Sequence, residues 1–223
     1  MRDQVVVWSW NLEADSLSFE AAEALLLEDE KARGRRFVTA PLRHRFVAGR
    51  ARLRTLLGKH LGLDPATLIF VENAFGKPRL ADHPSLHFSL SHSGDQAVLA
   101  VSEQREIGID MERVRPLDHL DLARRYFHPN EVATIEGVRQ PEEQLLAFFR
   151  IWTLKEAVVK AVGKGLSIPL DTFEVSIATS PPTMVVAPEG APPAWWLHQT
   201  VGGYCLALAV PGGGDVGLIQ RTV

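Results

Sequence analysis

The amino-acid sequence predicts an α+β fold made of two similar halves. The main observation is the order of elements, because a strand, then helices, then further strands can be traced twice along the 223 residues. The joint between the two passes lies near residues 103 to 108. No sequence identity between the halves is visible, so the repeat is one of pattern only. Hydrophobic residues make up 46% and charged residues 23% of the chain, which is typical of a globular protein that buries a core.

The first half should contain two helices and four strands. Residues Val5 to Trp10 are β-branched and aromatic, and Ser18 followed by an acidic residue marks the start of a helix. After Pro41, apolar residues recur at three- and four-residue steps as far as Gly62, which predicts a second helix with an arginine-rich opposite face. The expected helices are 18–36 and 41–62. The expected strands are 5–10, 67–72, 85–91 and 96–102, the last two forming a hairpin that turns at 93–95.

The second half repeats this order with a longer central helix. A short strand at 107–112 is followed by expected helices at 117–125, 131–138 and 142–162, and then by strands at 173–178, 195–200 and 204–210. The proline-rich stretch 180–193 is typical of a surface loop, and Gly212 to Gly214 of a turn near the C-terminus.

Charge and cysteine content exclude several classes of protein. Lysine and arginine total 24 against 27 aspartate and glutamate residues, a net charge of −3, so we expect no nucleic-acid partner. No run approaches the ~20 apolar residues of a membrane helix, and residues 1–8 lack a full signal-peptide core. The single cysteine, Cys205, excludes a disulfide framework and a cysteine-ligated metal, and fits a reducing compartment. We therefore expect a cytoplasmic protein without a membrane segment.

Two acidic residues stand at alternate positions of the predicted strand at 107–112. Alternation along a strand places Asp110 and Glu112 on one face, while Ile109 and Met111 face the other way. The two carboxylates repel each other, and a divalent cation is one way to offset that repulsion. Magnesium is the natural candidate, because it prefers hard oxygen ligands and usually binds one or two carboxylates together with substrate phosphates. An edge strand with a polar outer face is the alternative.

A third acidic residue, Glu156, lies on an apolar and aromatic stripe of the predicted helix at 142–162. The other members of this stripe are Leu145, Phe149, Trp152 and Val159. A carboxylate in such surroundings needs a cation, a metal or a hydrogen-bond donor. Lys160, one turn further on, is one candidate, since pairs at i,i+4 are common on helix faces. Whether Glu156 pairs with Lys160 or joins Asp110 and Glu112 depends on whether the two segments meet in space.

Positive charge is concentrated in the first half. The arginines of one stretch are Arg33, Arg35, Arg36, Arg43, Arg45, Arg50, Arg52 and Arg54. The loop Phe75-Gly76-Lys77-Pro78-Arg79 adds a lysine beside a glycine, which lets the backbone approach an anion. At the predicted hairpin tip, Ser91 and His92 could reach a phosphate. Solvated helix faces or a nucleic-acid patch remain alternatives for the arginines, and His92 could instead hold the turn through hydrogen bonds.

Taken together, these segments resemble the surfactin-type 4′-phosphopantetheinyl transferases over most of the chain. The resemblance rests on four motifs in the family's order. They are Phe75-Gly76-Lys77-Pro78, Phe88-Ser89-Leu90-Ser91-His92-Ser93-Gly94, Gly108-Ile109-Asp110-Met111-Glu112, and the stretch from Trp152-Thr153-Leu154-Lys155-Glu156 through Lys160-Ala161 to Gly163-Lys164-Gly165-Leu166. The segment Ile168-Pro169-Leu170-Asp171-Thr172-Phe173 also resembles the family.

The resemblance implies a fold, a reaction and a partner. The fold is an α+β protein of two halves related by a pseudo-twofold axis, with coenzyme A bound in the cleft between them. Residues 1–106 would form the half that contacts the nucleotide, and 107–223 the half with the metal site and the carrier-protein surface. The reaction transfers the phosphopantetheine arm of coenzyme A to a serine hydroxyl of an acyl, peptidyl or aryl carrier protein and releases adenosine 3′,5′-bisphosphate. The enzyme is expected to act as a monomer.

Site residues follow from the family's motifs. By this pattern Asp110, Glu112 and Glu156 would hold Mg²⁺ on the pyrophosphate, and the catalytic residues would be Glu156, Lys160 and Asp110. Glu156 could also accept the serine proton, directly or through a water, although a carboxylate bound to a cation is a weakened base. The residues implied to bind coenzyme A are Arg33 with Lys31 as a second candidate, Lys77, Pro78, Ser91, His92, Asp110, Lys155 and Lys160.

Some correspondences carry alternatives. Phe46 stands where some relatives have a small hydroxylated residue, so the adenosine contacts could differ. Glu131 matches an acid linked to catalysis, or it is simply an acid in the first turn of a helix. Leu117, Leu120, Tyr126 and Phe127, with Arg124 and Arg125, could form the carrier-binding surface, or the apolar four could fill the core. A noncatalytic coenzyme A or nucleotide binding module of the same fold is the alternative function; an intact acidic cluster argues against it.

Overall fold

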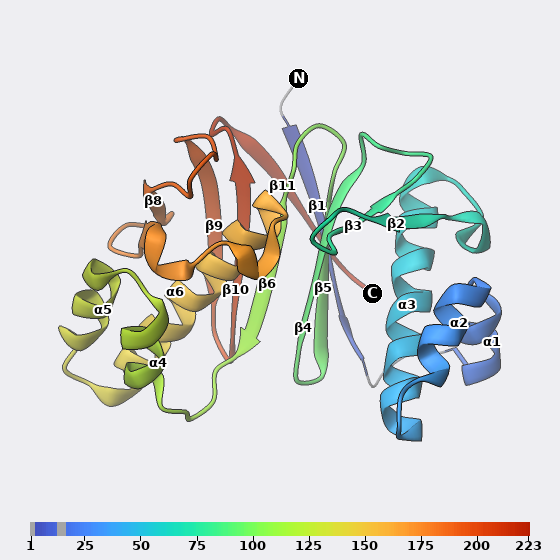
Figure 1. Cartoon of the computed structure of the whole chain (residues 1–223), viewed down its shortest axis with the longest axis horizontal. Helices are drawn as coiled ribbons and strands as arrows, with labels where there is room; N and C mark the ends of the chain where they lie inside the picture. The colour runs from blue at the N-terminus through green and yellow to red at the C-terminus, as the bar shows by residue number, and fades with distance from the viewer. Residues whose placement is uncertain (1–2, 13–16) are drawn as a thin grey trace.

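The computed structural model describes residues 3–12 and 17–223 (Figure 1). In the first half, the helices are α1 (Phe19–Ala24), α2 (Glu28–Arg35) and α3 (Ala40–Leu61), with a 3-10 turn at Pro65–Thr67. The strands are β1 (Asp3–Asn11), β2 (Phe70–Glu72), β3 (Pro78–Leu80), β4 (His87–Ser93) and β5 (Gln96–Ser102). The helix expected at 18–36 is therefore two helices, and the short strand β3 was not predicted.

The second half begins with β6 (Gly108–Arg113). Its helices are α4 (His119–Tyr126), α5 (Pro129–Glu136) and α6 (Pro141–Val162), followed by 3-10 turns at Gly165–Ser167 and Leu170–Thr172. The remaining strands are β7 (Glu174–Ser176), β8 (Thr183–Val186), β9 (Trp195–Val201), β10 (Tyr204–Pro211) and β11 (Val216–Thr222). β8 lies within the proline-rich stretch that was expected to be a loop, so that expectation was wrong in part. β11 was not predicted.

Local signals in the sequence set the helix ends. The Ser18 side chain accepts a hydrogen bond from the Ala21 amide at 3.2 Å and caps α1. Both long helices end at a glycine in the left-handed region, Gly62 after α3 (φ 69°) and Gly163 after α6 (φ 74°). Glycine adopts this conformation without the steric penalty of a Cβ, so each helix stops where the sequence places one.

Two sheets pack face to face between the two long helices. The first sheet has the strand order β11-β1-β5-β4 and the second β6-β10-β9. In β1, Trp8 and Trp10 pack with the α3 residues Leu53, Leu56 and Leu57, whereas Val5 and Val7 pack with Ile109 and Leu208 of the second sheet. In β10, Ala207 and Ala209 pack instead with residues of α6. Period-two alternation thus gives each sheet one face for its helix and one for the other sheet.

The two halves lie side by side, and β4 and β6 are at their boundary (Figure 1). The last strand departs from the division at residue 106, because β11 pairs in parallel with β1 and so completes the sheet of the first half. The expected second half, 107–223, therefore does not form one sheet of its own. β1 and β11 lie near opposite ends of the chain, so no local sequence pattern indicates that they pair.

None of the helices in the described parts of the chain is long and apolar enough to span a bilayer.

Candidate active site at the junction of the two halves

The acidic residues of β6 face helix α6. In the second sheet Asp110 lies opposite Ala207 and Glu112 opposite Cys205, and both of these β10 residues belong to the core under α6. Ile109 and Met111 point the other way, into the core between the sheets. The period-two prediction for this strand is therefore confirmed.

A glycine on β6 allows α6 to lie directly against the strand. A Cβ built on Gly108 would stand 1.9 Å from the Ala157 carbonyl oxygen and 2.4 Å from the Ala161 amide nitrogen. Only a residue without a side chain fits at this distance. The close approach brings the turn of α6 that carries Glu156 and Lys160 next to the carboxylates of β6, so the two segments singled out in the sequence do meet in space.

Asp110 is the centre of this cluster and is 5% exposed. Its Oδ1 accepts hydrogen bonds from Lys160 Nζ at 2.7 Å and from Ser91 Oγ at 2.8 Å. Its other oxygen, Oδ2, is buried and has no hydrogen-bond partner among the described residues. A buried carboxylate oxygen without a donor is unfavourable, so Asp110 has an unused position for a cation or a donor.

The other two carboxylates lie within electrostatic reach of Asp110. Glu112 Oε2 accepts a hydrogen bond from Ser93 Oγ at 2.7 Å. Burial raises the pKa of Glu156, the charges of Asp110 and Glu112 raise it further, and Lys160 opposes the shift. Lys160 forms its ion pair with Asp110 rather than with Glu156. The i,i+4 ion pair between Glu156 and Lys160 that was considered from the sequence is therefore not formed.

The residues fit a divalent cation that shares its coordination with phosphate oxygens. Within residues 3–12 and 17–223, no three His, Cys, Asp or Glu side chains form a ready-made metal cluster. Mg²⁺ seldom needs one, because it usually binds one or two carboxylates and completes its octahedron with water and substrate phosphates. The unpartnered Oδ2 of Asp110 and the neighbouring Glu112 and Glu156 supply the hard oxygen ligands that such an ion prefers.

Two adjoining pockets lie against the first half, and α6 lines the smaller of them. The smaller, about 420 Å³, is lined by Lys77, Glu156 and Lys160 among others. The larger, about 840 Å³, is lined by Arg33, Phe46 and His92 among others. Gly76, Pro78 and Leu90 line both. Most of the residues implied to bind coenzyme A therefore border one continuous surface, although they come from distant parts of the chain.

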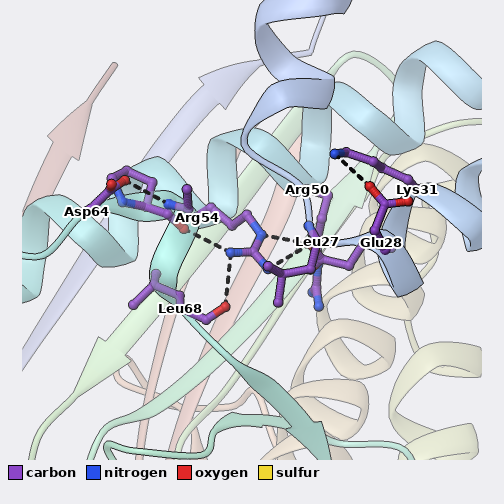
Figure 2. Close-up of polar contacts among 10 residues, drawn as sticks. Leu27, Glu28, Lys31, Arg50, Arg54, Asp64 and Leu68 are labelled. Atoms are coloured by element: carbon purple, nitrogen blue, oxygen red, sulfur yellow. Dashed lines mark hydrogen bonds and ion pairs between the residues drawn. The ribbon is translucent and has the colours of Figure 1, made fainter.

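Helix α2, which carries Arg33, is fixed to α3 by buried charges. Glu30 accepts hydrogen bonds from Arg50 and from Arg54 Nε, the latter at 2.8 Å. Arg54 is fully buried and also donates to the carbonyl oxygens of Pro65 at 2.8 Å and Leu68 at 3.0 Å (Figure 2). The ion pair with Glu30, 2.7 Å from Arg54 Nη2, and the hydrogen bonds from Nε and Nη1 offset most of the cost of burying the guanidinium. The contacts hold α2 at the edge of the larger pocket.

The two basic residues considered on α2 have different surroundings. Arg33 lines the larger pocket, is largely exposed and stands 3.7 Å from Glu72. Lys31 does not line it, and pairs instead with Glu28 on the same helix at 3.0 Å (Figure 2). Of the two, Arg33 is placed for an anion in the larger pocket.

Lys77 joins the two halves. Its ammonium group pairs with Glu106 and donates to the carbonyl oxygens of Ile107 and Ala161, each at 3.2 Å. Burial alone would raise the pKa of Glu106, but hydrogen bonds from His87 and Lys77 outweigh it and lower the pKa to about 2. Lys77 thus lines the smaller pocket while anchoring its loop to the second half.

Lys155 requires a correction, because it does not reach the pockets. It is 0% exposed, and its ammonium pairs with Glu131 at 2.8 Å and donates to the carbonyl oxygens of Leu170 at 2.6 Å and Phe173 at 2.7 Å. These three acceptors use all its donor hydrogens. The expected contact with coenzyme A was wrong, because Lys155 precedes Glu156 by one residue on α6 and its side chain is therefore turned away from that of Glu156 by about 100°.

Glu131 is likewise a structural residue. Besides pairing with Lys155, it accepts hydrogen bonds from the amides of His128 at 3.0 Å and Val175 at 2.8 Å. The first of these contacts caps the N-terminus of α5. The structure therefore favours the alternative in which Glu131 is an acid of the first turn of α5.

Most of the apolar residues considered for a carrier surface belong to the core. Phe127 is buried, and Leu117 and Leu120 pack against the core of the second half. Tyr126 remains 38% exposed, and Arg124 pairs with Glu136 at 2.7 Å.

Ser93 and Gly108 were not recognised from the sequence as residues that shape this site. The alternate serines at 89, 91 and 93 were a detectable signal, because polar residues at period two mark one face of a strand. Ser91 had been expected to contact phosphate. Its hydroxyl is 3.1 Å from Lys160 Nζ and donates to Asp110, so a phosphate would have to share it.

Comparison with known proteins places the chain in one family. Residues 106–209 match the model of the 4′-phosphopantetheinyl transferase superfamily, and residues 9–104 match that of the 4′-phosphopantetheinyl transferase N-terminal region. The chain is 37% identical to the 4′-phosphopantetheinyl transferase HetI of Nostoc sp. over 205 residues, covering 90% of this chain and 84% of that protein.

Two Bacillus subtilis proteins give a similar result. A 4′-phosphopantetheinyl transferase is 36% identical, over 77% of this chain and 75% of its own, and the transferase Sfp is 32% identical, over 75% and 73% respectively. These matches span both halves and include the β6 and α6 segments that form the acidic cluster. The chain therefore belongs to the 4′-phosphopantetheinyl transferase superfamily.

Proposed function

We propose that this transferase moves the 4′-phosphopantetheine arm of coenzyme A to a serine hydroxyl of an apo carrier protein, with Mg²⁺ held by Asp110, Glu112 and Glu156. The observation that carries the proposal is the meeting of β6 and α6 beside a pocket that Glu156 and Lys160 line. Asp110 pairs with Lys160, Asp110 and Glu112 lie within electrostatic reach of Glu156, and Arg33 lines the adjoining larger pocket. Such an arrangement suits a long substrate with a diphosphate in its middle.

In the proposed reaction, the serine oxygen attacks the β-phosphorus of coenzyme A. The bond from that phosphorus to the bridging oxygen breaks, and adenosine 3′,5′-bisphosphate leaves. A divalent cation on the carboxylates would neutralise charge that builds on the diphosphate oxygens. Lys160, 2.7 Å from Asp110 Oδ1, adds positive charge beside the same oxygens.

Glu156 is the proposed acceptor of the serine proton, directly or through a water. Burial and the charge of Asp110 raise its pKa while no cation is bound, which favours proton acceptance; a cation on the same carboxylate would act in the opposite direction. Glu131 is not available for this step, because it is buried in its pair with Lys155.

The remaining pocket residues would hold coenzyme A. Arg33 and His92 suit its phosphates in the larger pocket, while Lys77 and Pro78 border the passage to the smaller one. Phe46 offers an aromatic surface in the larger pocket. A single chain supplies all of these residues, so a monomer suffices. A buried free thiol at Cys205 suits the cytoplasm.

The test is intact-protein mass spectrometry of an apo carrier protein incubated with this protein, coenzyme A and Mg²⁺. We expect the carrier to gain one phosphopantetheine, and the gain to be lost with EDTA or with Asp110→Ala. Asp82→Ala removes an exposed acid of the same kind and should retain activity. If several carriers gain no mass although coenzyme A binds, the chain would be a noncatalytic binding module.

A further inference from the structure

Strands β4 and β6 run along the boundary between the halves, each at the edge of its own sheet. β6 pairs with β10 on one side only. An edge strand normally presents a row of unpaired amides, and buried amides without partners are strongly disfavoured. The edge of β6 is closed here by side chains rather than by another strand.

Three alternate serines of β4 provide the acceptors. Ser89 Oγ accepts the Ile109 amide at 3.0 Å, Ser91 Oγ the Met111 amide at 3.2 Å, and Ser93 Oγ the Arg113 amide at 3.1 Å. The residue numbers on β4 and on β6 both increase by two from one hydrogen bond to the next, so the two strands run in the same direction in a single register. We call Ser89, Ser91 and Ser93 the serine ladder.

The serine ladder lies on the face of β4 that is turned toward the core between the two sheets, where apolar side chains are usual. On the neighbouring strand, Ser91 lies opposite Val98 and Ser89 opposite Ala100, and both of these β5 residues are buried in the core between the sheets. A small side chain with one donor and two acceptor positions fits there only if its hydrogen bonds are made.

Two members of the ladder also use their donor hydrogens on the acidic residues. Ser91 Oγ donates to Asp110 Oδ1 at 2.8 Å, and Ser93 Oγ donates to Glu112 Oε2 at 2.7 Å. Ser89 has no carboxylate contact among the described residues. The Ser91 and Ser93 hydroxyls each accept a hydrogen bond from the backbone amide of the residue that follows the acid on β6. Each hydroxyl therefore fixes the position of the Asp110 or Glu112 carboxylate relative to the backbone of β6.

We infer that Ser93 is a positioning residue for the cation site: the serine ladder of the first half sets the orientation of the carboxylates on β6, with Ser93 acting on Glu112 and Ser91 on Asp110. This inference rests on the proposed function of Asp110, Glu112 and Glu156. Because the positioning contacts come from β4 and the carboxylates from β6, the cation site depends on the register between the two sheets.

The test measures cation binding directly. The full chain, saturated with coenzyme A, is titrated with Mn²⁺ while free Mn²⁺ is followed by electron paramagnetic resonance. We expect Ser93→Ala to weaken Mn²⁺ binding about tenfold, since loss of a hydrogen bond to a metal ligand commonly has an effect of this size. In a Glu112→Ala background the same substitution should have no further effect on Mn²⁺ affinity.

Ser89→Ala is the matched control, because it removes a ladder hydroxyl of the same kind that contacts no carboxylate. It should lower the melting temperature as Ser93→Ala does, and leave Mn²⁺ affinity unchanged. Ser93→Thr keeps a hydroxyl and should restore most of the affinity, which separates positioning from a folding defect.

The outcomes distinguish the inference from the proposed function. If the wild type and Asp110→Ala bind Mn²⁺ equally, or neither binds it, the proposed cation site is wrong and the positioning role is wrong with it. If Asp110→Ala loses binding but folded Ser93→Ala binds Mn²⁺ as tightly as the wild type, only the positioning role is overturned. The same holds if Ser89→Ala weakens Mn²⁺ binding as much as Ser93→Ala does, or if folded Ser93→Thr binds as weakly as Ser93→Ala.

Discussion

At the residue scale, the negative charge of Glu156 is unfavourable in the folded protein without a bound cation, and a role in cation binding or proton transfer would explain why it is kept. Burial and the charges of Asp110 and Glu112 raise its pKa, and its neighbour Lys160 is paired with Asp110. We expect Glu156→Gln to leave thermal stability unchanged or raised in EDTA buffer, because it removes a poorly compensated charge. The same variant should lose about 100-fold or more in transfer rate, the usual effect of removing a general base. Thermal melting and the mass assay measure the two effects; marked destabilisation would point to a structural ion pair instead.

Lys155 and Lys160 should respond differently, although both are lysines of the same motif. Lys155→Met leaves Glu131 buried without its cation, and removal of one member of a buried pair commonly costs about 3–5 kcal/mol. We expect lower stability in urea unfolding and, in the folded fraction, an unchanged KM for coenzyme A. Lys160→Met should instead lower the transfer rate and cost less stability than Lys155→Met, because Lys160 is partly exposed and Asp110 keeps its hydrogen bond from Ser91. A raised KM for folded Lys155→Met would restore Lys155 to the phosphate site.

At the element scale, the site depends on the contact of α6 with β6. Gly108→Ala would place a Cβ against the backbone of Ala157 and Ala161, and backbone atoms cannot yield as a flexible side chain can. We expect a loss of stability of about 1–3 kcal/mol or more and a larger loss of transfer activity, because α6 must move away from Asp110. Gly202→Ala is the control: a Cβ there meets nothing within 4 Å, and both properties should be unaffected. Normal activity of Gly108→Ala would show that the site tolerates displacement of α6.

At the scale of the whole molecule, Glu106 pairs with His87 and with Lys77, and Lys77 also donates to the Ala161 carbonyl oxygen of the second half. Its pKa in the folded protein is about 2, below the ordinary 4.5, so its stabilising effect is present above about pH 4.5 and is lost as the pH falls toward 2. We expect Glu106→Gln to cost about 1 kcal/mol or less at pH 7, since a pair in which Glu106 is 49% exposed is screened by water. Urea unfolding should show this difference shrinking as the pH is lowered. The control Glu103→Gln, at an exposed residue, should change stability little at either pH; a Glu106→Gln effect independent of pH would contradict the assignment.

Much of this molecule follows from local patterns in its sequence. Alternation in β6 placed Asp110 and Glu112 on one face, helical spacing placed Glu156 on a partly buried stripe of α6, and glycines marked where the long helices end. Of the residues that the resemblance implied, Arg33 and His92 line the larger pocket and Lys77 the smaller one, whereas Lys155 lines neither. These properties are local, because the rise and twist of a helix or strand are the same wherever the element lies.

Other features were decided only by tertiary contacts. The parallel pairing of β11 with β1 joins the two ends of the described chain, and the burial of Lys155 beside Glu131 depends on how α5 packs against α6. The serine ladder could be noticed as a pattern, but its partners lie on a different sheet. Local patterns in the sequence predicted the long helices, the main strands and the faces of β6, and the motifs predicted the family; they did not predict β3, β8 or β11. The tertiary structure decided which charged residues are satisfied inside the protein and which remain free for a substrate, because the energy of a charge depends on the burial and the partners that distant segments supply.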